Sequence, residues 1–217
     1  MKDIVRTLLL TTLLFILPSL AFAISTASSS DTLNIDWEQD SGVFIWGESA
    51  YGMNGADAIW GTEMVSNYDS PGWVTKLESV EDTSSAAIEN SGSAAVGEAA
   101  TTTRSVSSSA QITNNGTGLT LSASGTSHLV RNFSISTDGV TDHFFEFELD
   151  AEYLFTDQAS LENSATEWAY WHHHAALILS YHNGTEWTVL DEAVIAYGMS
   201  DSGSVSGILS VADTSGW

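Results

Sequence analysis

The sequence predicts an all-β protein, an antiparallel β-sandwich or jelly roll. Three observations support this fold class. Apolar and polar residues alternate along several stretches, those stretches are rich in β-branched and aromatic residues, and Gly, Asn and Ser separate them at short intervals. Short strands at this spacing, with almost no helical pattern, are typical of sandwiches and jelly rolls.

Residues 1–23 are expected to be a cleaved secretory signal peptide. Two basic residues precede a largely apolar run at 8–17, and the small residues "AFA" at 21–23 suit signal peptidase. The apolar run is too short to span a membrane comfortably. The mature protein is therefore expected to begin near Ile24 and to be secreted, either extracellular or at the cell surface.

The charge of the chain limits its partners. It has 28 acidic and 5 basic residues and a formal net charge of −23. This charge repels nucleic acid and anionic membranes, and the mature chain has no apolar segment of membrane length. It suits divalent cations or neutral polymers as ligands. The chain has no Cys, so its stability must come from apolar burial, to which the many aromatic residues contribute.

The first part of the mature chain is predicted to contain a flexible segment and two short strands. Residues 24–32, "ISTASSSDT", are mostly small and polar, which is typical of a flexible leader. A single sandwich domain is expected over 33–217, with strands near 43–46 and 73–78 between Gly-rich loops. The ending "TSGW" is neither a polar tail nor a strand end, which indicates an incomplete reading frame.

Residues 79–127 are dominated by Ser, Ala, Thr and Gly. We expect long strands with small side chains near 93–113 and 119–136. The stretch "AQITNNGTGLTLSAS" has an Asn/Gly turn between two β-rich arms, which predicts a hairpin. Small side chains allow close packing of two sheets, or leave a flat surface that a partner can cover.

The stretch "HFFEFELDAEYLF" at 143–155 has the sharpest pattern in the chain. Its odd positions from 145 onward are apolar, and its central even positions are acidic. A helical period fits part of the stretch, but a period of two accounts for every odd position, and the aromatic residues favour a strand. We expect a strand with one face in the core and an acidic face in water.

The C-terminal part predicts a hairpin and a last strand. Two apolar, β-branched arms flank Asn183-Gly184, which predicts a type I′ turn. That turn would pair Tyr181 with Glu186 and Leu179 with Thr188. A final strand is expected over "SVSGILSVAD".

Within the acidic row, "ELDAE" resembles the Glu-x-Asp-x-Glu motif of family 16 glycoside hydrolases, which are secreted jelly rolls. The resemblance covers five residues and implies that Glu148 is a nucleophile, Asp150 its electrostatic partner and Glu152 the acid/base. Retaining chemistry needs its two carboxyl groups about 5 Å apart. Positions 148 and 152 are separated by about 13 Å on an extended strand, so both side chains would have to lean inward over a curved sheet. A solvated strand face is the preferred interpretation.

Calcium and a transition metal are alternatives at two other places. Carboxylates at Asp36, Glu38 and Asp40, like those of the acidic row, are hard oxygen ligands of the kind that calcium takes. His172 and His174 share one face of a strand and can chelate zinc or iron. Imidazoles that simply line a strand are the preferred interpretation, and the protein is not expected to require a cofactor.

Aromatic residues next to these histidines form a candidate carbohydrate site. Exposed Trp and Tyr rings can stack on sugars, and Trp168, Tyr170 and Trp171 are the candidates. Trp168 and Trp171 have odd separation, so at most one of them can serve a given platform. The alternative is that these rings fill the core.

The leader, the absence of Cys, the acidic balance and the Ser/Ala/Thr-rich stretch at 93–127 together resemble bacterial secreted surface proteins of the PEP-CTERM (exosortase-sorted) kind. Their sorting signal does not occur in these 217 residues. The resemblance implies a Gram-negative source and a link to exopolysaccharide. We therefore expect a non-enzymatic protein with a structural or adhesive role at the cell surface or in the extracellular matrix, with polysaccharide or calcium as ligands. The alternative is a retaining glycoside hydrolase that uses Glu148 and Glu152.

Overall fold

The computed structural model confirms the all-β prediction. The residues it describes contain strands and no helix, so no helix there is long and apolar enough to cross a membrane. All of the strand pairs are antiparallel. The described ranges are 24–36, 44–69, 80–115, 120–136, 147–162, 166–182 and 184–213.

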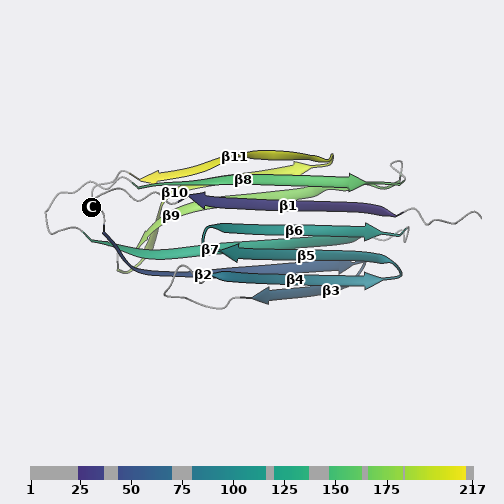
Figure 1. The fold of residues 1–217 in the computed structure, drawn as a ribbon, viewed down its shortest axis with the longest axis horizontal. Coiled ribbons are helices and arrows are strands. Elements are labelled where there is room, and N and C mark those ends of the chain that lie inside the picture. Colours follow the sequence, from purple (N-terminus) through teal and green to yellow (C-terminus); the bar gives the residue numbers. More distant parts are fainter. Residues whose placement is uncertain are drawn as a thin grey trace, which may run out of the picture.

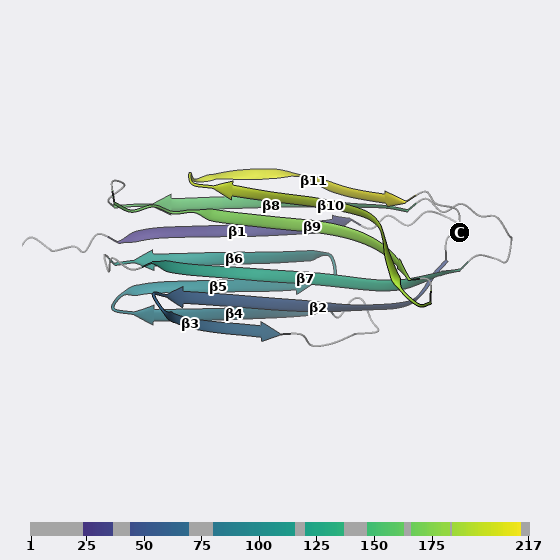
Figure 2. The same ribbon diagram turned by 180° about the vertical axis from the view of Figure 1, so that it is seen from behind.

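The strands lie in two layers, as expected for a sandwich (Figures 1 and 2). One layer is a six-stranded sheet in the order β11-β8-β1-β6-β5-β4. The other contains the three-stranded sheet β3-β2-β7 and the separate hairpin β10-β9. The bounds are β1 Ser25–Asp36, β2 Phe44–Trp60, β3 Glu63–Asp69, β4 Glu81–Asn90, β5 Ser93–Thr102, β6 Ser105–Asn114, β7 Leu121–Ser136, β8 Phe147–Ser160, β9 Trp171–His182, β10 Trp187–Met199 and β11 Gly203–Asp213.

Small side chains fill the half of the sandwich that contains β2 to β7. The buried cluster there consists of Ala56, Ala58, Ala86 and Ala95. A Cβ atom on Gly97 would collide with the carbonyl oxygens of Ser124 and Asp57 in the facing sheet. A Cβ atom on Gly125 would likewise collide with the carbonyl oxygen of Glu98. The two sheets therefore touch backbone to backbone, which only glycine at these positions permits.

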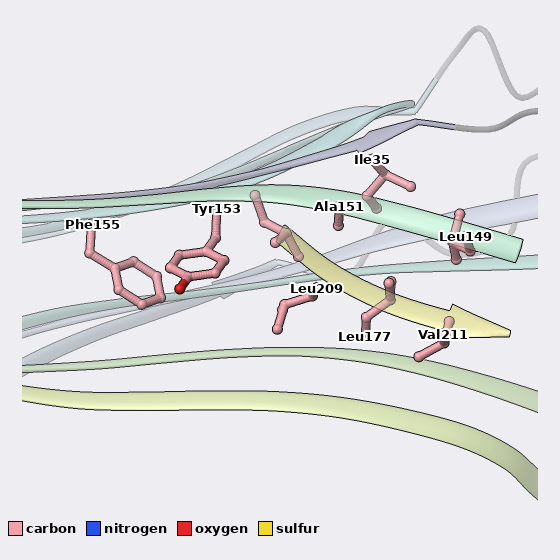
Figure 3. Packing of buried hydrophobic residues seen from close by; sticks show 9 residues of the cluster. Ile35, Leu149, Ala151, Tyr153, Phe155, Leu177, Leu209 and Val211 are labelled. Carbon is pink, nitrogen blue, oxygen red and sulfur yellow. The ribbon is translucent and has the colours of Figure 1, made fainter. Parts of the chain in front are cut away.

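Large side chains fill the other half. Figure 3 shows Leu149, Ala151, Tyr153 and Phe155 along one side of β8. These four odd-numbered residues are buried, whereas Glu148, Glu152 and Leu154 are exposed. The alternation predicted for the described part of 143–155 is confirmed. The whole cluster is Leu33, Ile35, Leu149, Ala151, Tyr153, Phe155, Leu177, Leu209 and Val211.

The prediction of a flexible segment at 24–32 was wrong. Residues 25–32 belong to β1, which lies inside the six-stranded sheet between β8 and β6. A strand with a neighbour on each side satisfies its backbone polar groups by pairing, so small polar side chains do not prevent it from forming. Composition alone missed this, because most of the stability of the strand comes from its neighbours.

The boundaries predicted for 93–136 were also partly wrong. A turn near Thr103 divides the stretch 93–113 into β5 and β6, which pair with each other. The expected hairpin around the Asn/Gly turn does not form, because β6 pairs with β1 and β5 whereas β7 pairs with β2 in the other layer. Both sides of β6 are already occupied, so the chain crosses to the facing sheet.

The hairpin predicted around Gly184 forms with a different register. Tyr181 pairs with Thr188 rather than Glu186, and Leu179 pairs with Asp191 after a bulge between Val189 and Asp191. This register places Ala193 and Ile195 against the core and Glu192 in water. Burial of the apolar face thus outweighs the preference for a two-residue turn.

The remaining strand predictions have mixed outcomes. The strand expected near 43–46 is the start of β2, which continues to Trp60 because β7 and β3 pair along it. The last strand is confirmed as β11. The strand expected at 73–78 and the signal peptide at 1–23 lie outside the described residues.

Candidate functional site

The outer face of the hairpin β9-β10 carries exposed aromatic rings and histidines. Trp168 is 78% exposed, and Tyr170 is also exposed, whereas Trp171 is buried where β9 begins. His172 and His174 are exposed on the same outer face. The structure thus brings two of the three predicted carbohydrate-binding rings to the surface and turns the third toward the core.

Tyr170 lies across β10 beside these histidines. A Cβ atom on Gly198 would collide with the Oη atom of Tyr170, so the ring lies directly over this glycine. Gly198 pairs with His172, and Ala196 pairs with His174. The small residues Ala196 and Gly198 thus lie opposite the two exposed histidines, and the ring of Tyr170 covers Gly198. Trp168 is an exposed ring two residues before Tyr170 in the chain. We call Trp168, Tyr170, His172 and His174 the aromatic face.

The acidic row lies on the outer face of the six-stranded sheet. Glu148 and Glu152 are exposed, and Asp150 is partly buried. β8 pairs with β11 from Phe147 to Asp157 and with β1 from Asp150 onward, and neither register has a bulge to bring the ends of the row together. The backbone here is therefore a regular strand.

The last residue of β1 is also an acid. Asp36 pairs directly with Asp150 across the two strands. The Oδ1 atom of Asp150 is buried without a hydrogen-bond partner among the described residues. Glu38 and Asp40 lie outside the described ranges. No three histidine or acidic side chains within those ranges are arranged to hold a metal ion.

A buried polar cluster, which the sequence patterns did not indicate, joins the two layers. His173 on β9 is 1% exposed and points into the sandwich. Its Nδ1 atom lies 2.6 Å from Oδ1 of Asp31 on β1, and its Nε2 atom lies 2.8 Å from Oδ2 of Asp157 on β8. The ring of Phe155 stacks on the imidazole at a centroid distance of 5.0 Å. We call Asp31, His173 and Asp157 the interlayer cluster.

The two hydrogen bonds of the interlayer cluster need one proton more than the N–H of a neutral imidazole supplies. A neutral imidazole has a single N–H and can donate to only one of the two carboxylates. The second hydrogen bond needs a proton on the other ring nitrogen or on a carboxyl group. Burial raises the pKa of Asp31 above its usual value, although the neighbouring His173 opposes this effect. Asp31 therefore keeps its proton to a higher pH in the folded protein than in the unfolded chain.

This proton makes stability depend on pH. A group whose pKa is raised by folding makes its full contribution to stability below its pKa in the unfolded chain, which is about 3.9 for Asp. That stabilisation is lost as the pH rises through the raised pKa of the folded protein. Asp31→Asn cannot ionise, and its amide can donate to Nδ1 of His173. In urea unfolding at increasing pH from about pH 4, the stability of this variant relative to wild type should increase until the pH passes the raised pKa of Asp31, by at most about 1.4 kcal/mol per pH unit.

Asp201→Asn is the control, because it removes one exposed acid elsewhere. It should follow the pH dependence of wild type. Equal pH dependence in wild type and Asp31→Asn would contradict a shared proton in the interlayer cluster.

The geometry favours a structural role for the interlayer cluster over a metal or catalytic one. Both ring nitrogens of His173 face carboxylates on opposite sides, so neither nitrogen is open to a metal. The side chain of Asp157 is 0% exposed, and its Oδ1 atom has no hydrogen-bond partner among the described residues. The sequence signal that could have found this cluster is the alternation of inward and outward positions along a strand. Asp31, Asp157 and His173 each occupy an inward position of their strand.

Comparison with protein-family models, with curated proteins and with solved structures gives no match for this chain.

Proposed function

We propose that this is a secreted, non-enzymatic β-sandwich protein with a structural or adhesive role, and that its aromatic face binds extracellular polysaccharide. The observation that carries this proposal is the exposure of Trp168 and Tyr170, together with the exposed histidines His172 and His174 that follow them. Exposed planar rings stack on the apolar faces of sugars, and imidazoles can hydrogen-bond to sugar hydroxyl groups. A strand pair provides a rigid base for both.

Charge supports a neutral polysaccharide as the ligand. The chain has a net charge of −23, so a polyanion would be repelled at neutral pH. The described outward residues of β9 and of the adjoining part of β10 include three histidines and one acid, Glu192. The acidic row lies on the opposite layer. The aromatic face is thus a weakly charged surface on a strongly acidic protein.

Trp168→Ala and Tyr170→Ala are each expected to weaken glycan binding about tenfold, because a lost stacking ring costs about 1–2 kcal/mol. Affinity electrophoresis in gels that contain β-glucan, xyloglucan or galactan measures the effect. Trp187→Ala is the matched control, since Trp187 is an exposed ring at the loop end of the same hairpin. Equal retardation of all three variants, or no retardation of wild type in any gel, would refute the proposed binding face.

The same glycans test the enzymatic alternative. The unbroken strand through Glu148 and Glu152 favours binding without hydrolysis, because retaining chemistry needs close carboxyl groups. Wild type should release no reducing sugar. Release that disappears in Glu148→Gln, with the fold intact, would instead support a glycoside hydrolase.

Calcium is proposed as an accompanying ligand of the acidic row, supported by the pairing of Asp36 with Asp150. Millimolar calcium should raise the Tm, by about 2–4 °C for each kcal/mol of binding free energy. Asp150→Asn should reduce this rise, whereas Glu192→Gln, an exposed acid on the other layer, should not. An unchanged Tm in wild type would remove calcium from the proposal.

A further inference from the structure

β11 forms one edge of the six-stranded sheet (Figure 1). It pairs with β8 without interruption from Gly203 to Asp213, and no described strand pairs with its other side. A free edge can pair with a strand of another molecule, so proteins usually protect edges with charges, proline or bulges.

Two other edge strands, β4 and β10, carry such protection. β4 has Glu81, Asp82 and Glu89. Side-chain hydrogen bonds also tie it to β3, since Asn67 donates to the carbonyl oxygen of Ser85 and Ser84 donates to that of Asn67. β10 has two acids and a bulge. By contrast, β11 has no charged residue and no proline from Gly203 to Ala212, and its register with β8 has no bulge.

One hydrogen bond indicates which backbone groups of β11 point outward. The amide of Ala212 donates to Oδ2 of Asp191 on β10, at 3.0 Å, rather than to β8. Backbone groups alternate sides along a strand, so the amides and carbonyls of Ser206, Ile208 and Ser210 also point away from β8. Apart from the position that Asp191 caps, these groups are available to an added strand.

We propose that β11 pairs with β11 of a second copy of this chain, antiparallel and centred on Ile208, so that the two six-stranded sheets join. Ile208 is the midpoint of the strand and is 63% exposed. A two-fold axis there places Ile208 against its own copy and Ser206 against Ser210. It also pairs Val205 with Val211, both on the core side, so inward and outward faces match.

Repulsion between the acidic residues of the two copies makes this pairing depend on salt concentration. The nearest described acid opposite the centre is Glu152, which pairs with Ile208 from β8. In the joined sheet the two copies of Glu152 would lie three strand spacings apart, about 14 Å. This exceeds the Debye length of about 8 Å at physiological ionic strength, so salt screens the repulsion between the two acidic rows. Association should therefore strengthen between low and physiological salt.

Ile208→Lys tests the proposed interface. Sedimentation equilibrium of wild type should show a monomer–dimer equilibrium, and the variant should dissociate about tenfold more readily or remain monomeric. The new lysine would face Glu152, which favours the folded monomer. Ile178→Lys is the matched control, because Ile178 is 53% exposed and pairs with Glu192 on the outer face of β9-β10.

Single cysteines test the register, because the natural chain has none. Ile208→Cys should form a disulfide-linked dimer under mild oxidation, since opposed residues in a hydrogen-bonded pair have Cα atoms about 5.5 Å apart. Ser204→Cys should not, because its two copies would lie about 27 Å apart. A wild type that is monomeric at every salt concentration overturns the proposal. So does a dimer that persists unchanged in Ile208→Lys, or equal cross-linking of the two cysteine variants.

Discussion

Replacing His173 by alanine is expected to lower the free energy of unfolding by about 3–5 kcal/mol, because it leaves two carboxylates facing each other without a partner inside the sandwich. Asp157 has no exposed side-chain surface, and the Asp31 side chain is 22% exposed, so water cannot fully replace the imidazole. The variant also loses the ring that stacks on Phe155. Urea unfolding at neutral pH, followed by tryptophan fluorescence, measures the change.

His172→Ala and His174→Ala are the controls, since they flank His173 on the same strand but point into water. Each should change stability by less than about 0.5 kcal/mol. In a double-mutant cycle, Asp157→Asn should be less harmful in the His173→Ala background than in wild type, because it removes a charge that has lost its partner. A loss at His173 no larger than at its neighbours would show that the interlayer cluster does not stabilise the fold.

Gly125→Ala is expected to destabilise the protein by about 3 kcal/mol or more, although Gly to Ala in a strand is usually favourable. The added methyl group would collide with the carbonyl group of Glu98 and approach Cβ of Ser108 at 2.9 Å. Backbone atoms cannot move aside as a flexible side chain can, so the two sheets would have to separate along this half of the sandwich. Thermal and urea unfolding measure the effect, and Gly97→Ala should behave similarly.

Gly203→Ala is the control for this prediction. A Cβ atom there would lie 3.3 Å from Cε of Met199, the flexible end of a side chain that can shift. This variant should retain wild-type stability within about 0.5 kcal/mol. If Gly125→Ala were equally well tolerated, the two sheets would not be in backbone contact.

The candidate binding residues were partly predictable from local pattern. Odd separation predicts opposite faces of a strand for Trp168 and Trp171. The structure exposes Trp168, which precedes β9, and buries Trp171, where β9 begins. The same parity places His173 inside while its neighbours remain outside. Local pattern did not indicate that Asp31 and Asp157, distant in sequence, would meet this imidazole.

The sequence by itself determined the fold class and the two faces of β8, because alternation with a period of two is a local property of the chain. It also determined the turn at Gly184 as a place where the chain reverses. Tertiary structure decided that the polar residues 25–32 form an inner strand, that β6 and β7 lie in different layers, and that β10 shifts its register. Pairing of distant strands and burial of one face set these features, and both are long-range interactions that no short stretch of sequence contains.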